Sequence, residues 1–154
     1  TVRNGDINFV AGTIEQITEV SKRGKEVAKK YGNPIKTYAL YTLIIADTDE
    51  EAKAIEQHYI AGTDAASFEK LQEARKNDKA GSTTTDLLGE IFIAPTLVGS
   101  PETIVDIFEH LEKETDIDGL ILTFPDYVED FDYFEKNVLP LIKTRGLHKT
   151  LATV

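Results

Sequence analysis

Strand-like and helix-like hydrophobic patterns alternate along the first part of the chain. A short apolar run over residues 7–10 predicts a strand, and apolar residues spaced by three, four or seven positions over 14–31 predict a helix after it. Thr13 is expected to cap this helix, and the Gly-Asn-Pro sequence at 32–34 is expected to end it. The chain therefore opens with one strand–helix unit.

The longest apolar run spans residues 35–46 and is rich in β-branched and aromatic side chains. This composition is typical of a strand that is buried on both faces of a parallel sheet. A helix is expected to follow it to about residue 61, because Asp47, Thr48 and Asp49 offer side-chain oxygens to a helix N-terminus. These residues form a second strand–helix unit.

The clearest local signal lies at Ser100 and Pro101. Ser is a favoured N-cap and Pro is favoured at the first helical position, so a helix is predicted to begin here. An apolar strand is predicted over 116–124, followed by a helix whose apolar residues have heptad-like spacing. Pro140 lies inside that pattern, which predicts a kink or a break near Lys136.

Residues 62–95 interrupt the strand–helix pattern and are expected to form an insertion, and residues 147–154 a tail after a domain at 1–146. Repeated strand–helix units predict an α/β fold with a parallel sheet. The three predicted strands have helices for only one face of their sheet, and a closed (β/α)8 barrel needs roughly 200 residues or more. The predicted fold is a partial (β/α)8 TIM barrel: three parallel strands, helices and an insertion segment.

The 154 residues include 27 acidic and 17 basic side chains, a formal net charge of −10. This charge argues against nucleic acid or an anionic membrane as the main partner, because both require clustered Lys and Arg. No apolar run approaches the roughly 20 residues that span a bilayer, so a soluble, cytoplasmic protein is expected. The absence of Cys excludes disulfides and Cys-ligated zinc. The absence of Met leaves two explanations open, a removed initiator or a piece of a longer chain.

Few residues suggest chemistry of their own. His58, His110 and His148 are spread along the chain rather than clustered, so no metal site is expected. No catalytic triad is evident, and no catalytic residue is assigned. The helix N-terminus at Gly99 and Ser100 could hold an anion, with a plain helix cap as the alternative.

Several stretches, taken in their order and spacing, resemble the C-terminal part of flavin-dependent, luciferase-like monooxygenases. They are Asp6-Ile7-Asn8-Phe9, Tyr38 through Ala52, His58 through Asp64, Thr96 through Ser100, Gly119 through Glu129, and Leu139-Pro140-Leu141 with Arg145. The resemblance covers residues 6–146. It is closest to the pyrimidine oxygenase branch, which opens the uracil ring with reduced FMN and dioxygen.

The resemblance implies a (β/α)8 barrel in which this chain supplies the last three strands. It also implies FMN as cofactor, a flavin reductase that supplies reduced FMN, and a homo-oligomer. The family's best-defined flavin contacts, including the serine that holds the FMN phosphate, lie in the N-terminal half of the barrel. Activity is therefore expected only together with that half. The cofactor performs the chemical step, while the protein supplies binding, orientation and exclusion of water.

Barrel active sites lie at the C-terminal ends of the strands. By resemblance, Asn8 and Phe9 are candidates for flavin contact, with ordinary strand packing as the alternative. Phe124 and Asp126 are candidates for the substrate pocket, with a helix cap as the alternative role of Asp126. The insertion at 62–95 is a candidate lid over the pocket or a surface excursion without a role.

Two other functions remain open. One is a non-enzymatic half-barrel that binds a ligand or self-associates, because unpaired strand edges are templates for association. The other is a flavin monooxygenase for another substrate class, such as a sulfonate, a sulfone or an aminopolycarboxylate.

Overall fold

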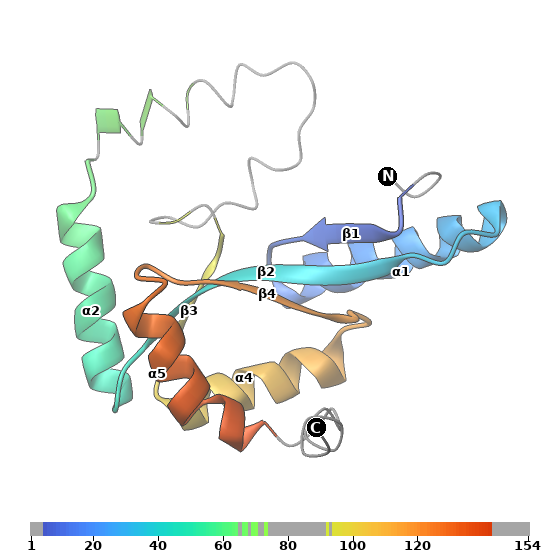
Figure 1. Cartoon of the computed structure of the whole chain (residues 1–154). Coiled ribbons are helices and arrows are strands. Elements are labelled where there is room, and N and C mark those ends of the chain that lie inside the picture. Colours follow the sequence, from blue (N-terminus) through green and yellow to red (C-terminus); the bar gives the residue numbers. More distant parts are fainter. Residues whose placement is uncertain are drawn as a thin grey trace.

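The computed structural model describes residues 5–64, 66, 67, 69, 70, 73, 92 and 94–142. Strands and helices alternate along this part of the chain (Figure 1). The elements are β1 (Ile7–Val10), α1 (Ile14–Tyr31), β2 (Lys36–Ile45), α2 (Asp49–Gly62), β3 (Thr96–Gly99), α4 (Pro101–Glu114), β4 (Gly119–Thr123), α5 (Glu129–Asn137) and the 3-10 helix η2 (Leu139–Leu141).

Local signals set the ends of α1 as predicted. The Thr13 N–H donates to the Gln16 side chain at 2.9 Å, and the Gln16 N–H donates back to the Thr13 hydroxyl at 3.4 Å, which completes a capping box. Gly32 ends the helix with φ of +66°. Only glycine adopts this left-handed conformation without steric cost, so the predicted stop is confirmed.

The other helix ends follow the same rules. Thr48 caps α2 by accepting from the Glu51 N–H at 3.2 Å, and Ser100 caps α4 with Pro101 at the first position. The predicted break before Pro140 is also confirmed, because α5 ends at Asn137 and continues only as η2. Proline has no N–H to continue the helical ladder.

β2 is the central strand and pairs in parallel with each of β1, β3 and β4. The N–H groups of Lys36 and Thr42 donate at 2.9 Å to the chain just before β1 and β3, whereas the Thr37 carbonyl accepts at 2.7 Å from the chain just before β4. Alternate residues of a strand direct their peptide groups to opposite edges. β1 and β3 therefore follow one another along one edge of β2, and β4 occupies the other edge.

The described part of the sheet has four strands, one more than predicted. The additional strand is β3, whose residues 96–99 were predicted only to lead into the helix that Ser100 caps. Its four residues are too few to show an alternating pattern. They form a strand because their peptide groups pair with residues 42–45 of β2. The predicted α/β class and the parallel direction of the strands are confirmed.

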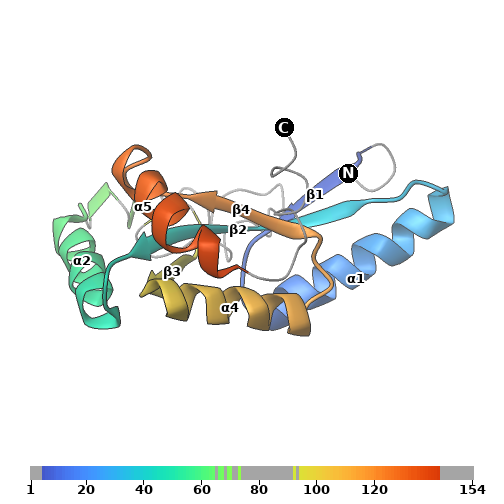
Figure 2. The same cartoon turned by 60° about the horizontal axis from the view of Figure 1, so that its bottom comes forward.

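Helices α1, α4 and α5 pack on one face of the sheet. Leu43 of β2 is buried with Ile104 of α4 and Phe134 of α5. Tyr41, two positions earlier and therefore on the same face, is buried with Ile17 of α1. Figure 2 shows α1 and α4 lying beneath the strands. The hydrophobic core thus lies between this face and its helices.

The opposite face of the sheet is open at β1. Phe9 is 65% exposed there and Ile7 is 46% exposed. Thr42 and Ile44 point to the same side from β2, yet each is only 2% exposed. The uncovered face that the sequence predicts is therefore observed at β1, whereas the same face is covered at Thr42 and Ile44 of β2.

A polar cluster ties α1 to the start of β4. The Ser21 hydroxyl donates to the Asp116 carbonyl at 2.9 Å. The Lys25 ammonium lies 3.1 Å from the Asp116 carboxylate and 3.3 Å from the Asp118 carboxylate. This cluster lies at the N-terminal ends of the strands, where barrel folds place stabilising contacts rather than ligand sites.

Some predictions fall mainly outside the described residues. These are the insertion at 62–95, of which only scattered positions are described, the tail at 147–154 and the position of Arg145. They remain predictions. Of the helices that the structure describes, none has both the length and the apolar composition needed to cross a bilayer.

Candidate functional site at the C-terminal edge of the sheet

The four described strands run in the same direction, and β2, β3 and β4 end near one another: Gly99 pairs with Ile45, the last residue of β2, and Thr123 pairs with Thr42, whereas Val10 of β1 pairs with Ala39, midway along β2. Ligand sites of α/β proteins lie outside the C-terminal ends of their strands. The edge formed by the ends of β2, β3 and β4 is therefore where the structure offers a functional site.

Asp49 is the first residue of α2, but its carboxylate contacts α4. One oxygen accepts from the Ser100 N–H at 2.7 Å, and the other accepts from the Thr103 hydroxyl at 3.0 Å. The Ser100 N–H, followed by the Thr103 hydroxyl, holds the pKa of Asp49 below its ordinary value. The sequence pattern predicts that Asp49 caps its own helix. Thr48 does so instead, and Asp49 joins two segments 51 positions apart.

Asp47 makes a second link from the same loop. Its carboxylate accepts from the Tyr133 hydroxyl of α5 at 2.6 Å. Burial, with the carboxylate of Asp47 as a further cause, raises the pKa of Tyr133 to about 12. The loop between β2 and α2 is thereby connected to both α4 and α5 at the C-terminal edge.

Gly99 is required where β3 turns into α4. A Cβ atom at this position would lie 2.6 Å from Thr103 Cγ2, 2.8 Å from Thr103 Cβ and 3.1 Å from an oxygen of Asp49. Real Cβ atoms do not approach other heavy atoms to within 3.0 Å. The missing side chain of Gly99 is what lets the carboxylate of Asp49 reach Ser100.

The structure separates the two predicted flavin contacts. The Asn8 amide turns toward α1, where its nitrogen lies 3.9 Å from the Cβ that an alanine at Gly24 would carry. Phe9 points to the opposite, open face. This follows from the alternation of side chains along a strand. Flavin contact stays a prediction for both residues, and only Phe9 presents an exposed ring.

Phe124 and Asp126 both lie where β4 meets α5, in different roles. The Phe124 ring is 6% exposed, and its centroid lies 5.9 Å from that of Tyr127 and 5.8 Å from that of Phe131. Asp126 accepts from the N–H groups of residues 128 and 129 at 2.8 and 3.1 Å. These bonds hold the pKa of Asp126 below its ordinary value. Pocket roles for Phe124 and Asp126 stay predictions.

Several residues at this edge are site candidates that the sequence patterns did not indicate. Tyr127 is 61% exposed and Phe131 is 49% exposed, and they form an aromatic surface over Phe124. Thr42 and Thr123 are paired across β2 and β4, and their hydroxyls lie 2.8 Å apart. The aromatic spacing in the sequence indicated only a helix. The threonine pair depends on strand register, which no local pattern gives.

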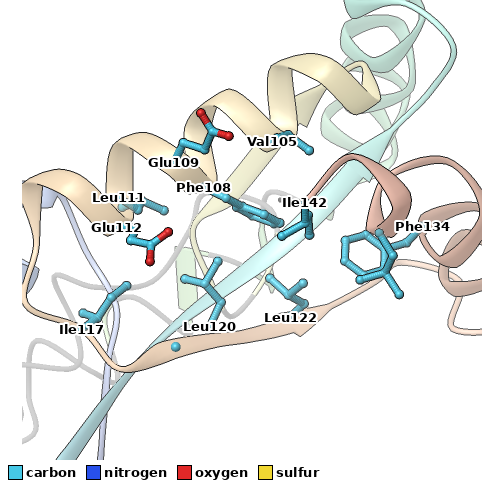
Figure 3. A pocket seen from close by; sticks show the side chains of 12 residues that line it. Val105, Phe108, Glu109, Leu111, Glu112, Ile117, Leu120, Leu122, Phe134 and Ile142 are labelled. Atoms are coloured by element: carbon cyan, nitrogen blue, oxygen red, sulfur yellow. The ribbon is translucent and has the colours of Figure 1, made fainter. Parts of the chain in front are cut away.

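An apolar cavity of about 340 Å³ lies away from this edge, on the helix-covered face (Figure 3). Side chains of α4, β4 and α5 line it, with Phe108, Leu120 and Phe134 among them. Glu109 and Glu112 of α4 supply its carboxylates. Across the described residues, His, Asp and Glu side chains form no group of three or more that could hold a metal ion.

Comparison with known proteins assigns the family. The family model of luciferase-like monooxygenases matches residues 1–116. The chain belongs to the luciferase-like monooxygenase family. It is 31% identical to the pyrimidine monooxygenase RutA of Caulobacter vibrioides over 94% of this chain and 44% of that protein. This luciferase-like chain thus spans less than half the length of the curated relatives that it matches.

Solved structures confirm the fold of this luciferase-like chain. DmoA from Hyphomicrobium sulfonivorans superimposes with a TM-score of 0.72 at 22% identity, over 94% of this chain and 38% of that one. Riboflavin lyase RcaE, solved with modified FMN and riboflavin, superimposes with a TM-score of 0.68 at 22% identity, over 95% of this chain and 40% of that one. The expected partial barrel is therefore confirmed as a fold.

The described residues fit one part of a flavin better than another. The exposed ring of Phe9 suits an isoalloxazine ring, because flat aromatic surfaces stack. A phosphate group prefers a helix N-terminus with free N–H groups. At this edge, the Ser100 N–H at the start of α4 donates to the carboxylate of Asp49, and the Glu129 N–H at the start of α5 donates to the carboxylate of Asp126. These two helix ends do not suit a phosphate.

Proposed function

We propose that this chain is the C-terminal part of an FMN-dependent monooxygenase that uses reduced FMN and dioxygen to oxygenate a small organic substrate. The observation that carries the proposal is the collinear similarity to pyrimidine monooxygenases over 94% of the chain. The parallel sheet supports it, because its described strands run in one direction and β2, β3 and β4 end close together, where a barrel active site would lie.

The proposed substrate is a pyrimidine such as uracil, whose ring is opened. The 31% identity to a pyrimidine monooxygenase supports this class, and sulfonates, sulfones and aminopolycarboxylates are the alternatives. In this proposal a flavin reductase supplies reduced FMN, the N-terminal half of the barrel completes the site, and the protein is a cytoplasmic homo-oligomer.

Four residues of this chain are proposed for the site. Phe9 contacts the flavin ring, because its aromatic ring is exposed. Asn8 is the preceding residue of β1 and is included on its sequence position alone. Phe124 and Asp126 shape the substrate side, since Phe124 supports the exposed Tyr127 ring and Asp126 fixes the first turn of α5. FMN supplies the oxygen chemistry when bound, and these residues bind, orient and exclude water.

The experiment joins this chain to the N-terminal half of the Caulobacter pyrimidine monooxygenase and assays uracil. The reaction contains NADH, FMN and a flavin reductase, and mass spectrometry detects the ring-opened product. The joined protein is expected to form this product, whereas the 154-residue chain alone is expected to form none. Omitting the reductase serves as the control for flavin dependence.

The other outcomes separate the alternatives. A joined protein that folds and binds FMN but leaves uracil intact argues against the pyrimidine class and directs the assay to sulfonates, sulfones and aminopolycarboxylates. A joined protein that folds without binding FMN contradicts the flavoprotein proposal. Gel filtration of the chain alone then tests whether it self-associates through its strand edges.

A further inference from the structure

The N-terminus of α4 has the features of an anion site and already contains an anion. Backbone N–H groups at a helix start lack partners within the helix, and the helix dipole favours negative charge there. The Ser100 N–H points to the carboxylate of Asp49 at 2.7 Å, and the Thr103 hydroxyl donates to the same carboxylate at 3.0 Å. The group that fills this helix end comes from α2 rather than from α4 itself.

The surrounding geometry shows that this position is built for a carboxylate. Gly99 lacks the Cβ that would stand 3.1 Å from the carboxylate oxygen. Asp49 also belongs to the first turn of α2, so its charge faces the positive ends of two helices. Ser100 caps α4 through its hydroxyl, which leaves its N–H for Asp49.

We propose that Asp49 is the resident anion of the α4 N-terminus, fixing the loops after β2 and β3 to one another and excluding phosphate groups from this helix end. Two roles follow. Asp49 is a positioning residue, because it acts through Ser100 and Thr103 on the shape of the C-terminal edge. It is also a specificity residue, because a second anion would meet both its charge and its occupied donors. The consequence for where FMN binds rests on the proposed function, whereas the occupancy itself does not.

The first test uses the unaltered chain. Protonation of Asp49 weakens its bond with the Ser100 N–H, so the Ser100 amide proton is expected to shift as pH is lowered in an NMR titration. The pKa of Asp49 read from this shift is expected below the ordinary value of an Asp carboxyl, because the Ser100 N–H and the Thr103 hydroxyl donate to it. Asp49→Asn is expected to abolish this shift. A Ser100 amide that does not titrate in the unaltered chain overturns the proposal.

The second test asks whether removal of the resident anion opens the site. Asp49→Ala leaves the donors of α4 exposed, so inorganic phosphate is expected to bind and to raise Tm at constant ionic strength. At ten times a millimolar Kd the rise is about 3–6 °C for a domain of this size. The unaltered chain and the matched variant Glu50→Ala, which keeps Asp49, are expected to show no such rise.

The outcomes are decisive without any flavin. If phosphate raises the Tm of Asp49→Ala no more than it raises the Tm of the unaltered chain and of Glu50→Ala, the proposal that Asp49 excludes phosphate is overturned. If Asp49→Ala does not fold, Asp49→Asn and the amide titration decide. Because neither measurement involves FMN or uracil, failure here is distinguishable from failure of the proposed monooxygenase function.

Discussion

Gly99→Ala tests the close contact between β3, α4 and Asp49. The new methyl group would lie 2.6 and 2.8 Å from two carbons of Thr103. One of these carbons is Thr103 Cβ, which is fixed to the first turn of α4 and cannot rotate away. Relief therefore requires the helix to move, and that movement would lengthen the bond between Asp49 and Ser100.

The expected loss of stability follows from two opposing terms. Overpacking of a well-packed site costs about 1–3 kcal/mol. Replacing glycine by alanine also restricts the unfolded chain, which returns about 0.4–1 kcal/mol. The net effect is a loss of roughly 1–2 kcal/mol in the free energy of unfolding, or about 2–8 °C in Tm for a domain of this size.

Gly62→Ala is the matched control. Gly62 is the last residue of α2, and a Cβ atom there would have no heavy atom within 4 Å. The same substitution is therefore expected to stabilise the chain by up to about 1 kcal/mol. Urea unfolding followed by circular dichroism measures both variants against the unaltered chain.

The two glycines are expected to respond with opposite signs. If Gly99→Ala is as stable as the unaltered chain, or if it is stabilised like Gly62→Ala, the contact between the β3–α4 turn and Asp49 is looser than the distances indicate. A loss in Gly99→Ala with unchanged m-value would instead confirm that the native state alone is affected.

Three further predictions concern the core, the polar cluster and pH. Leu43→Ala removes a fully buried side chain between the sheet and α4, so urea unfolding should show a loss of about 2–5 kcal/mol, and a loss under 1 kcal/mol would contradict the packing. Lys25→Met removes the ion pairs with Asp116 and Asp118, so a loss of about 1 kcal/mol is expected at low salt and a smaller one in 1 M NaCl; a salt-independent loss would argue against an electrostatic origin. Folding lowers the pKa of Asp126, so its carboxylate stabilises the folded state at pH values above the ordinary Asp pKa of about 3.9, and this contribution is lost as pH falls through the folded-state pKa. Asp126→Asn should therefore reduce the fall of Tm at acid pH in a Tm-against-pH profile. An unchanged fall would refute the assignment.

The sequence alone determined the features that depend on neighbouring residues. The capping box at Thr13, the left-handed stop at Gly32 and the break before Pro140 each involve groups within a few positions of one another. The apolar run of β2 likewise indicated a buried, parallel strand, because burial on both faces leaves a continuous hydrophobic pattern. The α/β class and the resemblance to the family followed from these local patterns in their order along the chain.

Tertiary structure decided everything that depends on which distant segments meet. β3 is a strand only because it pairs with the end of β2. Phe9, and not Asn8, faces the open side, because α1 packs against the other side. Asp49 reaches α4 across 51 positions of sequence, although its local context indicated a cap for α2. A hydrogen-bond partner so far along the chain is chosen by packing and strand register, and neither is encoded in the residues next to Asp49.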